Sequence, residues 1–184
     1  LGSPASWLVD WFSGGSSAAG AHVNEQSAMR STTVFRCVSL LSGLVASIPL
    51  SVYEKTKGGR SDADDHRLYY LLHDEPNDLM GSYTWRQLIA VDLLLGGNHY
   101  SLIERDNANR VIGFLPLPRI NVEPLRENGQ TVYRVQTEGG NSIKVPSWDM
   151  IHIPGLGFDG IKGVSPISFV GKQSIGLELT MLEA

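Results

Sequence analysis

The chain has 184 residues, of which 42% are hydrophobic and 18% are charged, and its formal net charge is −4. This balance is typical of a globular domain and excludes a wholly disordered chain. The slight acidic excess gives no sign of a basic face that binds nucleic acid, and no apolar run reaches the roughly 18 residues needed to span a bilayer. The single cysteine, Cys37, excludes an intramolecular disulfide and argues against a cysteine-ligated metal site.

Residues 1–28 are predicted to form an N-terminal arm and a flexible linker. The apolar tip "WLVDWF" precedes the small-residue stretch "SGGSSAAGAHVNEQS", which carries too little apolar surface to order itself. The tip fits either a docking arm for a neighbouring molecule or a helix that becomes ordered only in an assembly, and the sequence leaves both open. It lacks the basic leader and the cleavage site of a signal peptide.

Residues 29–48 are predicted to form the first long helix. Val34, Val38, Leu41 and Val45 recur at helical spacing. Three further residues lie beside this stripe, namely Cys37, Leu44 and Ile48. We therefore expect this side of the helix, with the thiol of Cys37, to pack in the core.

Two further helices are predicted before the pattern changes period. After Pro49, "LSVYE" predicts a strand and "KTKGGRSDADD" is interpreted as a solvated loop. Residues 66–77 favour a short helix that ends before Pro76. Residues 83–95, "YTWRQLIAVDLLL", follow a capping Ser82 and are apolar on nearly every side. We expect this second long helix to be buried.

Strand-like alternation begins after Gly96-Gly97, which end the helix. The predicted strands are "NHYSLIER", "RVIGFLPLP", "INVEPLR", "TVYRVQT" and "SIKVP". Asn128-Gly129, between the third and fourth of these, is a strong signal for a tight hairpin turn. Helices followed by a run of antiparallel strands indicate an α+β fold rather than an alternating parallel sheet.

The titratable residues offer few catalytic arrangements. Asp149 and His152 are three residues apart, and a carboxylate that orients an imidazole is half of a hydrolytic triad, but no serine stands on a recognisable nucleophile elbow. His152 lies between two isoleucines on an expected strand, so a surface or interface histidine is favoured. His66, His73 and His99 have acidic neighbours, but none has the spacing of helical zinc ligands. The sequence therefore predicts no catalytic, cofactor or metal site and no enzyme.

A glycine run near the C-terminus offers the main alternative function. Gly155, Gly157 and Gly160 spell G-x-G-x-x-G, the fingerprint of a dinucleotide-binding loop, so a nucleotide-binding enzyme is the rival hypothesis. In such loops the helix opens within the glycine run, so that its N-terminal amides face the pyrophosphate. Here the helix start signal, Ser165-Pro166, comes five residues after the third glycine. A tight connection with positive backbone angles is the favoured interpretation.

Several landmarks together resemble one protein family. "VFRCVSLLSGLVASIPLSVYEK", "LLHDEPN", the step at Gly97, Asn98 and Tyr100, "RVIGFLPLP" and "DGIKGVSPI" occur in order and at matching spacing. The chain, over about residues 19–184, resembles the N-terminal half of portal proteins of long-tailed, siphovirus-type bacteriophages.

The resemblance implies a structural function. Portal proteins form a ring, usually a dodecamer, at one vertex of the capsid, through which double-stranded DNA is packaged and ejected without tight binding. Terminase, capsid and tail-connector proteins dock on the ring, and the portal itself hydrolyses nothing. The implied location is the virion, and the host cytoplasm during assembly. Another viral head–tail adaptor is the remaining structural alternative.

The resemblance also implies a division of the chain. Residues 1–28 are the arm and linker, residues 29–164 a wing-type α+β domain, and residues 165–184 the start of a long stem-type helix. The chain begins without methionine and stops inside an apolar helix. We therefore expect it to continue in the complete protein.

Overall fold

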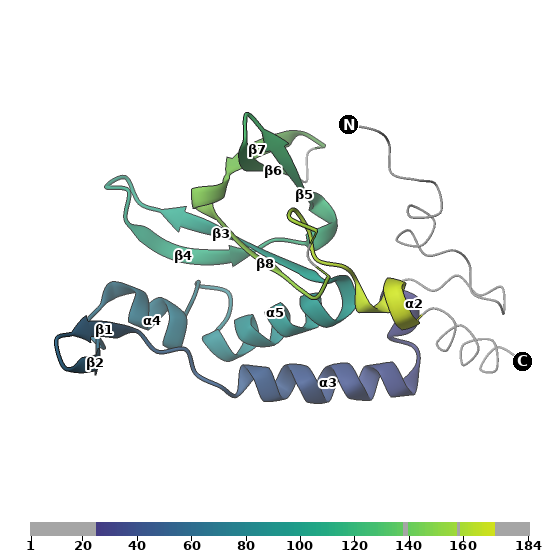
Figure 1. Cartoon of the computed structure of the whole chain (residues 1–184), viewed down its shortest axis with the longest axis horizontal. Coiled ribbons are helices and arrows are strands. Elements are labelled where there is room, and N and C mark those ends of the chain that lie inside the picture. The colour runs from purple at the N-terminus through teal and green to yellow at the C-terminus, as the bar shows by residue number, and fades with distance from the viewer. Residues whose placement is uncertain (1–24, 138–139, 158, 172–184) are drawn as a thin grey trace, which may run out of the picture.

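The computed structural model describes residues 25–137, 140–157 and 159–171; the N-terminal tip and most of the predicted C-terminal helix lie outside them. Helices dominate the first half of the described chain and antiparallel strands the second (Figure 1). The fold is α+β, as the sequence predicted. Among the described residues, no helix combines the length and the apolarity needed to cross a membrane.

Two long helices form the helical layer. The α-helices are α2 (Glu25–Ala28), α3 (Thr32–Ala46), α4 (Arg67–His73) and α5 (Ser82–Gly96). α3 and α5 pack extensively against each other. α3 begins at Ser31, whose hydroxyl accepts a hydrogen bond from the Val34 amide at 3.3 Å. α5 ends at Gly97, whose φ of 72° is the left-handed conformation that glycine adopts without steric cost.

Two three-stranded antiparallel sheets follow, in the orders β4-β3-β8 and β5-β6-β7. Their strands are β3 (Asn98–Arg105), β4 (Val111–Pro116), β5 (Val122–Glu127), β6 (Gln130–Gln136), β7 (Ser142–Pro146) and β8 (Met150–Pro154). The turn between β5 and β6 has positive φ at Asn128 and Gly129, which confirms the predicted hairpin. Single turns, η1 (Arg119–Asn121) and η2 (Ser147–Asp149), precede β5 and β8, and η3 (Ile167–Gly171) ends the described chain.

β3 lies at the centre of the molecule because both of its faces are covered. Leu71, Trp85 and Phe114 fill the space between the helices and the sheet that contains β3. On the other face, Tyr100 belongs to a second cluster shared with β5, β6 and β7. That cluster comprises Tyr100, Val122, Tyr133, Val135, Val145 and Met150. Adjacent side chains of β3 therefore enter two different cores.

The prediction for α3 was right for Val38, which is buried, and for Val34, which is half-buried, but wrong for the rest of the predicted stripe. The buried residues of this helix are small, namely Val38, Ser42 and Ala46, spaced four apart against α5. The larger side chains of the predicted stripe point outward, and Cys37 is exposed. Small residues allow the two helix axes to approach closely, so close packing selected the small side of α3 rather than its most hydrophobic side.

The segment interpreted as a solvated loop contains a strand. β1 (Tyr53–Thr56) pairs with β2 (Gly59–Asp62) in an antiparallel hairpin, and the expected strand "LSVYE" begins three residues later than predicted. All residues of both strands are exposed. Exposure on both faces removes the hydrophobic alternation by which a sequence signals a strand.

The predictions for α4 and α5 need smaller corrections. The N-cap of α5 is Gly81, and the hydroxyl of Ser82 instead donates a hydrogen bond to the carbonyl oxygen of His73, which ties α5 to the end of α4. α5 is also less enclosed than expected: one side is buried and much of the rest is half-buried.

Candidate functional site

The first four residues of β3, Asn98 to Ser101, are all buried, and three of them are polar. Because side chains alternate along a strand, His99 and Ser101 face α5, whereas Asn98 faces β8 and the glycine run. We call these three residues, with Asp92 and His152, the β3 polar cluster. It is the largest concentration of buried polar groups in the described chain.

On the α5 side, the cluster forms a hydrogen-bonded chain. Nδ1 of His99 donates to the carboxylate of Asp92 at 2.7 Å, and Nε2 lies 2.8 Å from Oγ of Ser101. The indole N–H of Trp85 donates to the same Oγ at 3.1 Å. The serine hydroxyl can therefore donate its own proton to Nε2 of His99. Each of the hydrogen-bonding groups named here then has a partner.

Asp92, His99 and Ser101 are the residue types of a hydrolytic triad. The sequence analysis did not predict that they would be brought together. Their burial argues against catalysis: His99 and Ser101 are both 0% exposed. Trp85 occupies the remaining side of the serine oxygen, so no substrate carbonyl reaches the position from which Oγ would attack. We interpret this series of hydrogen bonds as a structural network that joins α5 to β3.

On the opposite side, Asn98 fastens the chain at Gly163, three residues after the glycine run. Its amide Nδ2 donates to the carbonyl oxygen of Gly163 at 2.8 Å, and its Oδ1 accepts from the amide of the same residue at 2.7 Å. One side chain thus satisfies both backbone groups of a residue that is 65 positions away in sequence. This pairing fixes where the chain crosses β3 on its way to η3.

His152 connects the two sheets. Its ring stacks on Tyr100 with centroids 4.5 Å apart, and its nitrogens contact Tyr133 Oη at 3.2 Å and Asn98 Oδ1 at 3.0 Å. Oδ1 of Asn98 is an acceptor, so Nε2 of His152 carries the proton and Nδ1 accepts from the tyrosine hydroxyl. Of the two expected positions, surface or interface, the structure places His152 half-buried between two sheets, because the β6 sheet covers this face of β8. Asp149 bonds to Arg105 at 2.8 Å instead.

Burial shapes the ionisation of this side of the cluster. It lowers the pKa of His152 below its ordinary value, and the neighbouring His99 lowers it further. Burial also raises the pKa of Tyr133, so that hydroxyl keeps the proton that it donates to His152. Both shifts favour the neutral, hydrogen-bonded arrangement.

The glycine run serves a crossing of backbones. A Cβ at Gly163 would lie 2.2 Å from the carbonyl oxygen of Gly97, and one at Gly97 would lie 2.2 Å from the carbonyl oxygen of Val164. Gly157 and Gly160 have φ of 69° and 98°, which confirms the predicted tight connection. The close approach that a dinucleotide loop reserves for a pyrophosphate is made here by the chain's own backbone.

The loop has further support of its own. The carboxylate of Asp159 accepts hydrogen bonds from the amides of Ile161 and Lys162, and the Lys162 amide contributes most to lowering its pKa. After the loop, the hydroxyl of Ser165 accepts from the Ser168 amide at 3.2 Å, so the predicted helix start at Ser165 is confirmed.

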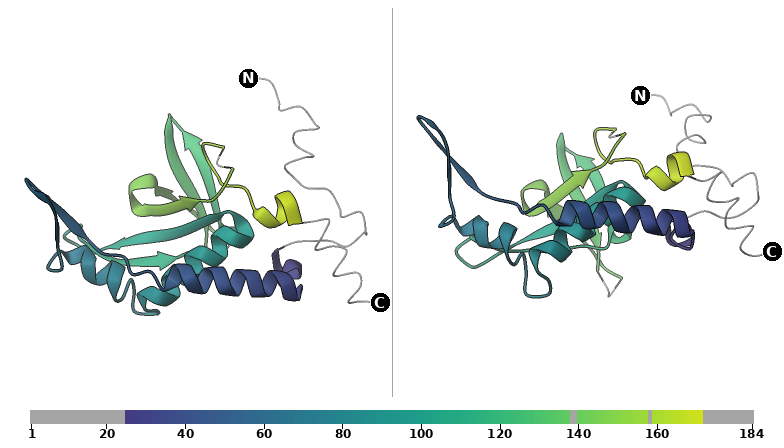
Figure 2. Two further views of the ribbon diagram at one scale, coloured as in Figure 1. Left: turned by 60° about the horizontal axis from the view of Figure 1, so that its bottom comes forward. Right: turned by 90° about the horizontal axis from the view of Figure 1, so that it is seen from below.

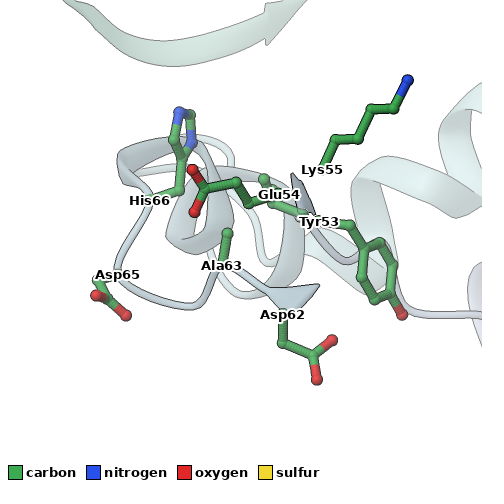
Figure 3. A pocket seen from close by; sticks show the side chains of 8 residues that line it. Tyr53, Glu54, Lys55, Asp62, Ala63, Asp65 and His66 are labelled. Carbon is green, nitrogen blue, oxygen red and sulfur yellow. The ribbon is translucent and has the colours of Figure 1, made fainter. Parts of the chain in front are cut away.

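The other candidate histidines do not converge on a site. His66 caps α4, and His73 pairs with the adjacent Asp74 at 2.9 Å. A shallow pocket beside His66 is lined by both signs of charge (Figure 3). In that view Lys55, Asp62 and Asp65 point in different directions rather than at a common centre. The described residues contain no group of three or more side chains placed to hold a metal ion.

An α+β body whose buried polar cluster completes its hydrogen bonds within the same chain has the character of a structural module. The phage portal protein family matches residues 32–184, and the chain belongs to this family. It is 34% identical over 161 residues to the portal protein of Enterobacteria phage HK97 and 29% identical over 178 residues to a probable portal protein of Streptomyces phage phiC31. These alignments cover 86% and 90% of the chain and 38% of each relative, so the chain spans less than half of their length.

The fold is similar to those of solved relatives. The neck of an empty GTA particle superposes with a TM-score of 0.72 at 19% identity, over 92% of this chain and 47% of the other. An HK97 family phage portal protein from Corynebacterium diphtheriae gives 0.52 at 22% identity, over 74% and 42%. The resemblance in the sequence is thereby confirmed, for both the family and the mixed helix and sheet fold.

Proposed function

We propose that the chain supplies the wing-type part of a portal protein, a subunit of the ring at the capsid vertex through which DNA is packaged and ejected. The observation that carries this proposal is the family match, which runs from the start of α3 to the end of the chain. In this proposal residues 29–164 are the wing-type domain, residues 1–28 an arm, and residues 165–184 the start of a stem-type helix. The protein resides in the virion, and in the host cytoplasm during assembly.

The described residues support a structural rather than an enzymatic role. The one arrangement of triad residue types is sealed, since Ser101 is inaccessible. Gly155, the first glycine of the run, is held against the backbone of Gly97, which weakens the nucleotide-binding alternative. The family match also favours a portal over another head–tail adaptor.

The proposal is tested by electron microscopy of the complete gene product that contains this sequence. Closed rings with a central channel are expected, usually of twelve subunits as in the family. A monodisperse monomer under every salt and concentration condition would contradict the proposal. Cryo-electron microscopy of virions with a label on this protein then distinguishes a single-vertex position from a position elsewhere in the particle.

Terminase, capsid and tail-connector proteins are the proposed partners, with DNA as passing cargo. With 15 basic and 19 acidic residues, the chain has no surplus of positive charge with which to hold phosphates. We expect duplex DNA to bind the isolated chain no more tightly than roughly 10⁻⁴ M at physiological salt, the weak end of non-specific binding. Fluorescence anisotropy with a random duplex measures this, and sub-micromolar binding with a steep salt dependence would reveal a basic face.

A further inference from the structure

The outward side of α3 is an apolar surface that nothing in the described chain covers. α3 contains one charged residue, Arg36, among fifteen. Four of its exposed residues form a stripe at helical spacing, namely Cys37, Leu40, Leu41 and Leu44, and the exposed Ile48 follows just past the end of the helix. Leu40 is 64% exposed and Ile48 is 65% exposed. Seen from below in Figure 2, α3 lies in front of the other elements. A helix that is apolar on both sides is normally buried on both sides.

The stripe continues past the end of the helix into the β1–β2 hairpin. Leu50 and Tyr53, both exposed, extend the apolar surface from Ile48 to the first strand. The hairpin projects beyond the body of the molecule (Figure 2), and neither strand packs substantially on another described helix or strand. A two-stranded hairpin by itself is marginally stable in water. Two adjacent features, a bare helix face and a bare hairpin, thus require the same kind of partner.

The path of the chain indicates which partner this is. The described chain ends in η3, which packs on α2 through Ile167 and Ala28, with Val34 of α3 beside them. η3 therefore lies at the N-terminal end of α3, whereas the hairpin lies beyond its C-terminal end (Figure 1). Gly171, the last described residue, thus lies at the end of α3 farthest from the hairpin. A neighbouring molecule reaches the whole surface more directly than the continuing chain does.

We propose that the outward face of α3 and the β1–β2 hairpin form one side of the contact between neighbouring copies of this protein. This inference rests on the proposed ring. Each copy in a ring uses two different surfaces, so the face binds another part of the next copy rather than itself. The apolar residues of this surface run from Cys37 on α3 to Tyr53 on the hairpin, and each of them is exposed. Burial of this apolar surface supplies the driving force.

Cys37 provides a reporter for this contact, because it is the chain's single cysteine and lies on the stripe. In the 184-residue chain, maleimide modification of Cys37 should be fast at low protein concentration and should slow as sedimentation velocity shows self-association. Leu40→Glu with Leu44→Glu should raise the self-association Kd by about thirtyfold or more, the size expected for central interface residues. The variant's thiol should react fast at every concentration.

Matched variants separate this surface from a general effect of added charge. Ile143→Glu, on β7, introduces the same charge at a half-exposed isoleucine on the sheet farthest from α3 and should associate like the wild type (Figure 1). Tyr53→Ser, on the hairpin, should weaken association without adding charge. Near-ultraviolet circular dichroism at low concentration checks that each variant is folded.

The outcomes for this surface and for the ring are distinguishable. Rings of the complete gene product that survive Leu40→Glu with Leu44→Glu would overturn the inference and leave the proposed function intact. A 184-residue chain that associates without slowing the modification of Cys37 would also overturn it. Failure of the wild-type complete product to form any ring would instead contradict the proposed function.

Discussion

The β3 polar cluster and the outward face of α3 both depart from the usual rule that apolar side chains are buried and polar ones exposed, but in opposite directions. At β3, polar side chains are enclosed, and their hydrogen bonds are completed within the same chain. On α3, apolar side chains are left open to solvent. Enclosing unpaired polar groups costs free energy, and so does exposing apolar surface. The polar cluster finds its hydrogen-bond partners inside the monomer, whereas the apolar face of α3 finds no cover among the described residues.

The two regions have different roles: one fixes the internal geometry of the monomer, and the other is available for binding. The polar cluster fixes the internal geometry: Asp92 joins α5 to β3, and Asn98 sets the crossing of the glycine run. Because hydrogen bonds are directional, such a network specifies one arrangement more narrowly than apolar contact does. The face of α3 specifies little within the monomer and is suited to binding. Substitutions in the two regions should therefore differ in size and in their dependence on protein concentration.

The largest effect is expected at Trp85, which is 2% exposed. Trp85→Ala removes the stack on Phe114, with centroids 5.5 Å apart, and the hydrogen bond to Ser101. The free energy of unfolding should fall by about 3–5 kcal/mol, measured by urea denaturation of the 184-residue chain. Trp148→Ala, at an exposed tryptophan on η2, is the matched control and should change it little. Equal effects at the two tryptophans would contradict the assignment of the core.

An intermediate effect is expected at Asn98. Asn98→Ala leaves the amide and carbonyl of Gly163 and one nitrogen of His152 without their partner. Orphaned polar groups of this kind cost about 1–3 kcal/mol. Hydrogen exchange of the Gly163 amide should accelerate more than that of the β5 amides. As a control, Asn141→Ala, at an exposed asparagine, should change neither the free energy of unfolding nor the exchange rate of the Gly163 amide. Uniform acceleration across the chain would mean that Asn98 supports the whole fold rather than the crossing.

A smaller and pH-dependent effect is expected at His152. Its pKa is lowered in the folded state, so the unfolded chain binds more protons as the pH falls below about 6.5, the ordinary value for histidine. Stability should therefore decrease as the pH is lowered through and below this value. His152→Gln retains a donor for Asn98 and should flatten this part of the profile. Urea midpoints between pH 8 and pH 5 measure it, and identical slopes for both proteins would contradict the prediction.

The two regions also differ in how far the sequence could predict them. The strand "NHYSLIER" was predicted with the observed limits, because its alternation and the preceding glycines are local signals. The partners of Asn98 lie 54 and 65 residues away, so they depend on how the sheets pack. The network between Asp92 and His99 is closer in sequence, but no spacing rule relates a helix residue to one on the next strand.

α3 was mispredicted for a different reason. The helix itself was predicted, and its start and end were nearly right. Hydrophobic periodicity identifies a core side only when the opposite side is polar, and both sides of α3 are apolar. Val38 was predicted to be buried, but Ser42 and Ala46 beside it were not, because their small size, which lets α5 approach, is a criterion that periodicity does not contain. The excess of apolar residues was itself a signal that the helix has a second partner.

The smallest effect on the monomer is expected at Leu40, and its smallness is informative. Leu40 belongs to the same hydrophobic class as core residues whose truncation costs 2–5 kcal/mol, but it is already largely solvated in the monomer. Leu40→Ala should therefore change the free energy of unfolding by less than about 0.5 kcal/mol at low protein concentration. At concentrations where copies associate, the wild type should gain stability from binding and the variant should gain less. Thermal unfolding at a series of protein concentrations measures both the effect on the monomer and the stability gained by association. A large effect at low concentration would place Leu40 in the monomer core, whereas an equally small effect at all concentrations would show that the face of α3 binds nothing.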